Sequence, residues 1–164
     1  MIRKVFVIVS RLLLPGILLI TPYKKFLVLK AAFLSMQKVD VGKDVCVSRG
    51  FFSISGSGIR IGEGSHIGTF FKVYDIDRIN IGKNALISHD VRIISGTHII
   101  DVERTPVDAQ VDIGDNVWIG INVSIVGPCI IGDNCIIGAN SYVTGNFGDN
   151  LVIAGSPAKA IKEV

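Results

Sequence analysis

The stretch VDIGDNVWIGINVSIVGPCIIGDNCIIGANSYVTGNF, residues 111–147, repeats every six residues. A period of six fits neither an α-helix nor an ordinary alternating strand. It predicts a parallel β-helix, in which each hexapeptide supplies one short strand and a turn, and stacked coils bury an aliphatic column. The aliphatic residues at the third position of the successive hexapeptides are Ile113, Ile119, Ile125, Ile131, Ile137 and Val143.

The size of one coil follows from a longer repeat. The tetrapeptide IGDN occurs at 113–116 and again at 131–134, eighteen residues later. Three hexapeptides therefore close one coil, and the cross-section is expected to be triangular. A second core series stands two residues before the first and comprises Val111, Val117, Val123, Cys129, Cys135 and Ser141.

The repeat continues upstream with extra residues in each coil. VGKD at 41–44, IGEG at 61–64 and IGKN at 81–84 are twenty residues apart, which is one coil plus two residues. We expect small bulges at 55–58 and 75–78 to absorb this surplus.

A larger surplus separates Ile81 from Ile113. The gap is thirty-two residues, which is one coil plus fourteen. Because the polar run DVERTPVDAQ at 101–110 comes shortly after His98, we expect a protruding loop at about 99–110. Insertions in solenoids usually emerge on a functional face.

Length and composition favour a single all-β domain over residues 37–164. The 164-residue chain is 49% hydrophobic but only 7% aromatic, which suits a core of stacked Ile and Val. A net charge of +3 is too small to indicate nucleic-acid binding and is compatible with an anionic cofactor. Three cysteines form no disulfide framework, so we expect a cytoplasmic location.

Residues 1–36 stand apart from the repeat. They are expected to form two short helices hinged at Pro15 and Pro22, because their uninterrupted apolar runs are shorter than the roughly 20 residues of a membrane span. The favoured interpretation is a helical cap on the open end of the solenoid. One alternative is peripheral docking on the inner face of the cytoplasmic membrane, and another is a true span or a cleaved leader.

Two motifs resemble those of a known family. GDNVWIG at 114–120 and the terminal segment TGNFGDNLVIAGSPAKAIK at 144–162 are similar to the hexapeptide-repeat acyltransferases, in particular the maltose, galactoside, nodulation-factor and polysaccharide O-acetyltransferases. The resemblance implies a left-handed coil, against the usual right-handed crossover. It also implies a homotrimer that binds acetyl-CoA between neighbouring subunits, and no metal.

The same resemblance assigns catalysis to His98. The segment SGTH, which ends at this residue, matches the position of the family's catalytic histidine. A sugar hydroxyl is a poor nucleophile until a base takes its proton, and neutral histidine is suited to that role near pH 7. A neutral histidine usually has a partner that fixes its tautomer. Asp101 and Glu103 lie in the following loop and could orient the imidazole, although a backbone carbonyl would serve equally well.

Four further residues, Trp118, Ala139, Thr144 and Asp75, match positions of the family that contact the cofactor or lie near the acceptor. His89 instead falls where relatives carry a proline, and Lys159 and Lys162 offer cations to the nucleotide phosphates. Each of these residues could instead have a purely structural role, in interface packing or repeat geometry, or be a solvated surface residue. Gly68 stands where relatives carry an asparagine near the reaction centre, and this departure leaves the acceptor open. The cofactor candidates are Trp118, Ala139, Thr144, Lys159 and Lys162, and the weaker acceptor candidates are Asp75 and His89.

The sequence therefore predicts an acetyl-CoA-dependent O-acetyltransferase that acts on a sugar of a surface polysaccharide or its precursor. N-acyl transfer to an amino sugar is an alternative on the same fold, and a non-catalytic β-helical scaffold is another. A carbonic-anhydrase-like zinc enzyme is the third, because the chain holds three histidines. The spacings from His66 to His89 and from His89 to His98, 23 and 9 residues, do not resemble the ligand spacing of that class.

Overall fold

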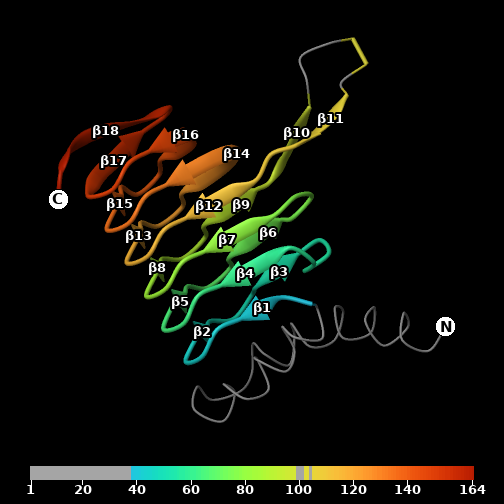
Figure 1. The fold of residues 1–164 in the computed structure, drawn as a ribbon, viewed down its shortest axis with the longest axis horizontal. Coiled ribbons are helices and arrows are strands. Elements are labelled where there is room, and N and C mark those ends of the chain that lie inside the picture. Colours follow the sequence, from blue (N-terminus) through green and yellow to red (C-terminus); the bar gives the residue numbers. More distant parts are fainter. Residues whose placement is uncertain (1–37, 99–101, 104) are drawn as a thin grey trace.

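The computed structural model describes residues 38–98, 102–103 and 105–164, and within these residues every regular element is a β-strand. The strands wind into a left-handed parallel β-helix with five complete coils and the start of a sixth (Figure 1). This confirms the predicted fold class. The expected helices of residues 1–36 lie outside the described residues, among which no helix is long and apolar enough to cross a membrane.

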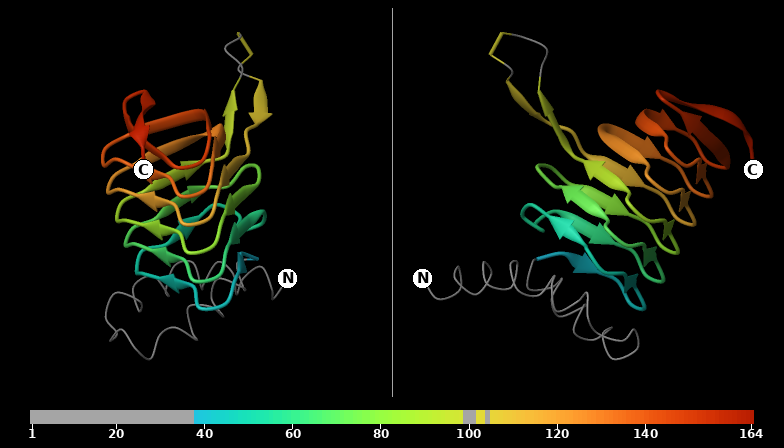
Figure 2. Two further views of the ribbon diagram at one scale, coloured as in Figure 1. Left: turned by 60° about the vertical axis from the view of Figure 1, so that its left-hand side comes forward. Right: turned by 180° about the vertical axis from the view of Figure 1, so that it is seen from behind.

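Three flat faces form the sides of the prism, and strands on each face pair in parallel from coil to coil (Figure 2). On the first face, Arg60 pairs with Asn80, Asn80 with Asp112 and Asp112 with Ile130. These steps of 20, 32 and 18 residues are the predicted coil lengths. The first face contains β1 (Asp40–Val41), β4 (Ile59–Ile61), β7 (Ile79–Ile81), β12 (Val111–Ile113) and the C-terminal part of β14 (Ser124–Ile131).

The other two faces follow the first in each coil. The second face contains β2 (Cys46–Val47), β5 (His66–Ile67), β8 (Leu86–Ile87), β13 (Trp118–Ile119), β15 (Ile136–Ile137) and β17 (Leu151–Gly155). The third face contains β3 (Phe52–Ser53), β6 (Lys72–Tyr74), β9 (Arg92–Ile94), the N-terminal part of β14 and the start of β16 (Tyr142–Phe147). Strands β14 and β16 continue round the corner from the third face to the first.

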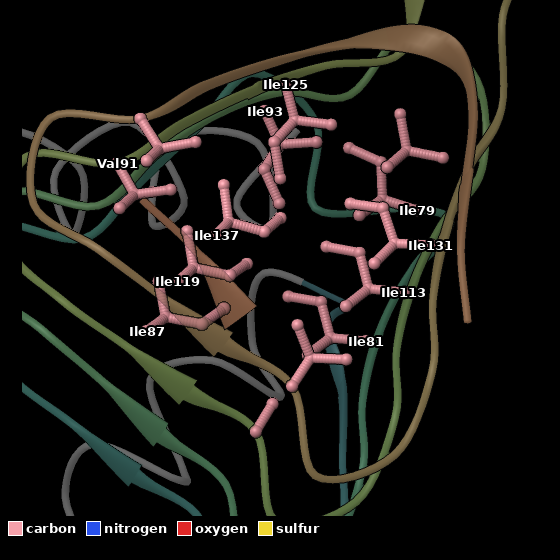
Figure 3. Packing of buried hydrophobic residues seen from close by; sticks show 14 of the residues in the cluster. Ile79, Ile81, Ile87, Val91, Ile93, Ile113, Ile119, Ile125, Ile131 and Ile137 are labelled. Carbon is pink, nitrogen blue, oxygen red and sulfur yellow. The ribbon is translucent and has the colours of Figure 1, made fainter. Parts of the chain in front are cut away.

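The core consists of aliphatic columns that run along the prism axis. Figure 3 shows Ile87, Ile119 and Ile137 stacked on one side of the core, opposite Ile81 and Ile113. All five side chains are at most 3% exposed. Complete burial of an isoleucine side chain contributes about 1.5–3 kcal/mol, so each coil is held mainly by contact with its neighbours.

Two cysteines of the repeat occupy core positions, as predicted. Cys129 and Cys135 are both buried and carry free thiols. Burial raises the pKa of the Cys129 thiol to about 12 and also raises the pKa of Cys135. Both thiols therefore stay protonated at neutral pH and act as small apolar groups.

The corners between coils depend on asparagine as well as glycine. Asn116, Asn134 and Asn150 have positive φ angles of 56–58°, a conformation that asparagine tolerates better than most residues. Their side chains also stack, because the amide of Asn116 donates to Asn134 at 3.2 Å and that of Asn134 donates to Asn150 at 3.1 Å. The IGDN repeat in the sequence marks Asn116 and Asn134 but does not predict that their side chains stack.

The fourteen-residue surplus leaves the prism as an antiparallel hairpin (Figure 1). Its strands are β10 (Gly96–His98) and β11 (Pro106–Asp108), and the Cα atom of His98 pairs with that of Pro106. The hairpin emerges at the corner between the third and first faces. The excursion was expected at about 99–110 but begins at Gly96, so His98 lies within it rather than before it.

The C-terminal segment differs from the prediction. Gly155 and Pro157 were expected to end the last strand and leave a basic tail. They instead form a turn, with φ of +111° at Gly155, into an additional strand, β18 (Ala158–Glu163). Strand β18 pairs antiparallel with β17 and extends the second-face sheet at the C-terminal end of the prism.

The columnar core predicts unequal effects for two neighbours on β14. Ile131 is 1% exposed, whereas Ile130 is 45% exposed. Replacing Ile131 with alanine should lower the free energy of unfolding by about 2–5 kcal/mol, because the shorter side chain leaves a cavity in the core between stacked coils. The matched Ile130→Ala change should stay within about 0.5 kcal/mol. Urea unfolding measures both, and equal losses would contradict the assigned inward and outward registers.

Candidate functional site

A groove of about 720 Å³ runs along the second face across five coils. It also includes the turns that lead from the second face to the third. Because the strands of this face are only two residues long in the first five coils, the groove is lined by outward side chains and by the backbone of the turns.

The C-terminal half of the groove is apolar. Trp118 and Leu86 occupy adjacent outward positions on β13 and β8 and are 50% and 51% exposed. Ile121, Ile136 and Ala139 complete the wall. A contiguous exposed apolar wall of this kind marks a binding region. Its shape and composition suit an extended, largely uncharged chain.

The N-terminal half is polar. Ser48, His66, Ser88 and His89 contribute side chains, and Gly68 contributes only backbone. Hydroxyl and imidazole groups offer both donors and acceptors, which suits a hydroxyl-rich ligand. The groove therefore has two chemically distinct halves that meet at the third coil, which contributes Leu86 to the apolar half and Ser88 and His89 to the polar half.

The structure brings together some of the cofactor candidates. Trp118 and Ala139 both line the apolar half of the groove. Lys159 and Lys162 lie outside it on β18, which belongs to the same sheet two strands beyond β15. Both lysines are exposed at the C-terminal end of the groove. Thr144 lies on β16, is exposed and does not line the groove.

His98 is separated from the groove of its own chain. Its side chain is exposed on β10, at the corner between the third and first faces, and it does not line the groove. The third face stands between the two sites. Of the two proposed orienting acids, Glu103 is exposed in the hairpin and Asp101 lies outside the described residues. A single chain therefore does not place His98 beside Trp118.

Asp75 has a defined structural environment. It is 3% exposed and accepts hydrogen bonds from the backbone N–H groups of Ile54 at 2.7 Å, Ser55 at 3.1 Å and Gly56 at 2.6 Å. The hydroxyl of Ser55 donates a further bond at 2.5 Å. A desolvated carboxylate is stabilised by such a set of donors. Asp75 therefore holds the bulge at 55–58 in the preceding coil. Its contact with an acceptor stays a prediction.

Two histidines in the groove have opposite hydrogen-bonding arrangements. The backbone N–H of Thr69 donates to Nδ1 of His89 at 2.9 Å. In His66, Nδ1 lies 3.2 Å from the carbonyl oxygen of Gly64, which can only accept. Neutral His89 thus carries its proton on Nε2, whereas neutral His66 carries its proton on Nδ1. His66 was expected at a turn but is an outward residue of strand β5.

The histidines do not gather into a metal site. No cluster of three or more His, Cys, Asp or Glu side chains suited to a metal ion occurs within residues 38–98, 102–103 and 105–164. His66 and His89 belong to the groove, and His98 belongs to the hairpin on another corner.

Comparison with known proteins identifies the repeat. Residues 111–145 match the family model "Bacterial transferase hexapeptide (six repeats)". Galactoside O-acetyltransferase of Escherichia coli K12 is 34% identical over 128 residues, which is 76% of this chain and 63% of that protein. A protein of the same organism named for O-acetyl transfer in lipopolysaccharide biosynthesis is 34% identical over 110 residues, 59% of this chain and 56% of the relative.

Solved structures extend the similarity to the fold. A maltose O-acetyltransferase from Clostridium difficile 630 is 30% identical with a TM-score of 0.81, and the match covers 92% of this chain and 82% of that one. A galactoside acetyltransferase in complex with coenzyme A is 29% identical with a TM-score of 0.79, covering 92% and 79%.

The coil geometry defines a left-handed β-helix protein with a groove along its second face. With the matches in sequence and structure, the chain belongs to the hexapeptide-repeat acyltransferase family. It spans 56% and 63% of the lengths of the two relatives from E. coli.

The environment of Asp75 yields a test that separates structure from binding. Asp75→Ala leaves the buried N–H of Gly56 and the part-buried N–H groups of Ile54 and Ser55 without their acceptor, and an unsatisfied buried donor costs about 1–3 kcal/mol. We expect the free energy of unfolding to fall by about 3 kcal/mol or more. Asp77→Ala in the same coil removes one local bond, to Arg78, and should cost about 1 kcal/mol or less.

Chemical denaturation of the two variants gives the comparison. A fully stable Asp75→Ala variant with impaired use of the acceptor would instead support a direct binding role for this carboxylate.

Proposed function

We propose that the protein is an acetyl-CoA-dependent O-acetyltransferase that acts on a sugar hydroxyl of a surface polysaccharide or its precursor. The observation that carries this proposal is the two-part groove on the second face. Its apolar half suits the extended acyl-pantetheine arm, and its polar half suits a carbohydrate. Relatives named for acetyl transfer to galactosides, maltose and lipopolysaccharide support the substrate class.

The acyl donor would lie along the second face. Trp118 and Ala139 would contact the arm, while the cations of Lys159 and Lys162, farther along the same sheet, would attract the nucleotide phosphates. The coenzyme A complex of the galactoside acetyltransferase supports this choice of donor. Thr144 lies at the corner between the third and first faces, so it would contact the donor from a neighbouring copy.

The acetyl group would pass directly from sulfur to oxygen. His98 takes the proton of the attacking hydroxyl, the new C–O bond forms, and the C–S bond breaks. The leaving thiolate then receives that proton from His98. No covalent enzyme intermediate is required.

The catalytic site would be shared between subunits. Because the third face separates His98 from the groove of its own chain, we propose that a neighbouring copy supplies His98 to each groove. Such a contact joins two different surfaces, and it closes into a ring when the copies are related by a threefold axis. A homotrimer would therefore contain three equivalent sites.

The experiment that tests this function is the replacement of His98. His98→Asn should lower turnover by about 10²–10⁴-fold, the usual contribution of a general base. Affinity for acetyl-CoA, assembly mass and thermal stability should stay nearly unchanged, because the exposed side chain contributes little to packing. Thiol release from acetyl-CoA, with galactosides, maltose and polysaccharide fragments as acceptors, measures turnover.

Mixed assemblies test the sharing of sites. His98→Asn and Trp118→Ala damage opposite sides of each interface, so co-assembly should restore sites that contain both parental residues. Activity above the sum of the separate variants supports sharing. Fully active His98→Asn protein would exclude this residue as the base, and a fully active monomer would exclude the shared site.

The two lysines of β18 should affect donor binding alone. Lys159→Ala and Lys162→Ala should each raise the KM for acetyl-CoA with little change in kcat, and the effect should weaken as salt screens the phosphates. Lys43→Ala removes an equally exposed cation near the other end of the prism and serves as the control. Unchanged KM values in both β18 variants would exclude this subsite.

A further inference from the structure

His89 lies where the two halves of the groove meet. It belongs to the turn after β8, directly over Thr69 of the coil below. On its other side its carbonyl oxygen accepts the N–H of Asn122, in the coil that carries Trp118 and Ile121. A ligand group beside His89 would therefore adjoin both the apolar half and the polar half of the groove.

The imidazole of His89 has a fixed orientation and a fixed tautomer. Nδ1 accepts the backbone N–H of Thr69 at 2.9 Å, and the Thr69 hydroxyl also lies 2.9 Å from it. Since a backbone N–H can only donate, the proton of the neutral ring is on Nε2. Among the described residues Nε2 has no hydrogen-bond partner, and the side chain is exposed in the groove. His89 therefore presents a single N–H donor to whatever occupies the groove.

The glycines around His89 do not offer this donor. The backbone N–H groups of Gly68, Gly120 and Gly138 each donate to a carbonyl oxygen of the next coil at 2.8 Å. A side chain cannot be added at Gly68 either, because a Cβ atom there would overlap the carbonyl group of Ser88. The coil-to-coil ladder thus consumes the N–H groups of these three glycines, whereas Nε2–H of His89 stays available to a ligand.

We propose that Nε2–H of His89 donates a hydrogen bond to the carbonyl oxygen of the bound acyl thioester. As the acceptor hydroxyl attacks and the C–O bond forms, negative charge develops on this oxygen, and a fixed donor stabilises it. The charge returns to the carbonyl as the C–S bond breaks and the thiolate leaves. Nε2 keeps its proton throughout, so His89 is distinct from the base. This inference rests on the proposed acetyl transfer.

The test uses variants that differ in the retained donor. His89→Ala should lower kcat by about 10²-fold, the usual effect of removing one donor to such an oxygen, with little change in affinity for acetyl-CoA. His89→Gln should recover part of kcat, because its amide nitrogen can occupy the place of Nε2. Lys83→Ala is the control and should retain kcat, since Lys83 is an exposed residue of the same coil that does not line the groove.

A spectroscopic measurement is independent of the acceptor. Infrared difference spectra of bound acetyl-CoA, labelled with ¹³C at the thioester carbonyl, report hydrogen bonding to that oxygen. We expect the carbonyl band to move to higher wavenumber in His89→Ala, and to stay near the parental position in His89→Gln and Lys83→Ala. Thermal melting and assembly mass verify that each variant is folded.

The outcomes separate the two proposals. An unchanged band and unchanged kcat in a folded His89→Ala variant that binds acetyl-CoA would overturn the role of His89 and leave the acetyltransferase function intact. Failure of the parent protein to bind acetyl-CoA would overturn both.

Discussion

Each coil of the prism is held by the contact between an inward aliphatic side chain and its counterparts one coil above and below. Ile87, Ile119 and Ile137 form one such column and exclude water almost completely. A strand of two or three residues has too few hydrogen bonds and too little buried surface to persist alone. The stacking therefore determines the register of the backbone ladder, and a shift by one residue would turn the column outward.

This register also determines what the outer surface can do. Once Ile119 points inward, Trp118 has to point outward, and its partners on adjacent coils are Leu86 and Ile136. The apolar wall of the groove is thus a consequence of core packing. The glycines of the turns serve the same constraint, since coils approach too closely for a side chain at Gly68. The N–H groups of Gly68, Gly120 and Gly138 are consumed by the ladder.

The candidate site combines an irregular element, the hairpin, with a pair of regular turns. The hairpin interrupts the coil sequence and carries His98 away from the prism, whereas His89 and Thr69 lie in ordinary turns of the repeat. The first was evident from a gap of thirty-two residues, because an insertion has to leave a periodic fold. The second gave no such signal. Its role depends on two turns, twenty residues apart in the chain, whose coils stack directly on one another.

The sequence alone determined the β-helix, the triangular coil and the existence of an excursion between Ile81 and Ile113, because hexapeptide periodicity directly records which side chains pack in the core. It also brought Trp118 and Ala139 to notice as cofactor candidates. Tertiary structure decided that the C-terminal segment is strand β18, that Asp75 holds a bulge and that His98 lies away from its own groove. Those properties depend on hydrogen bonds and distances between coils, and a repeat pattern does not encode them.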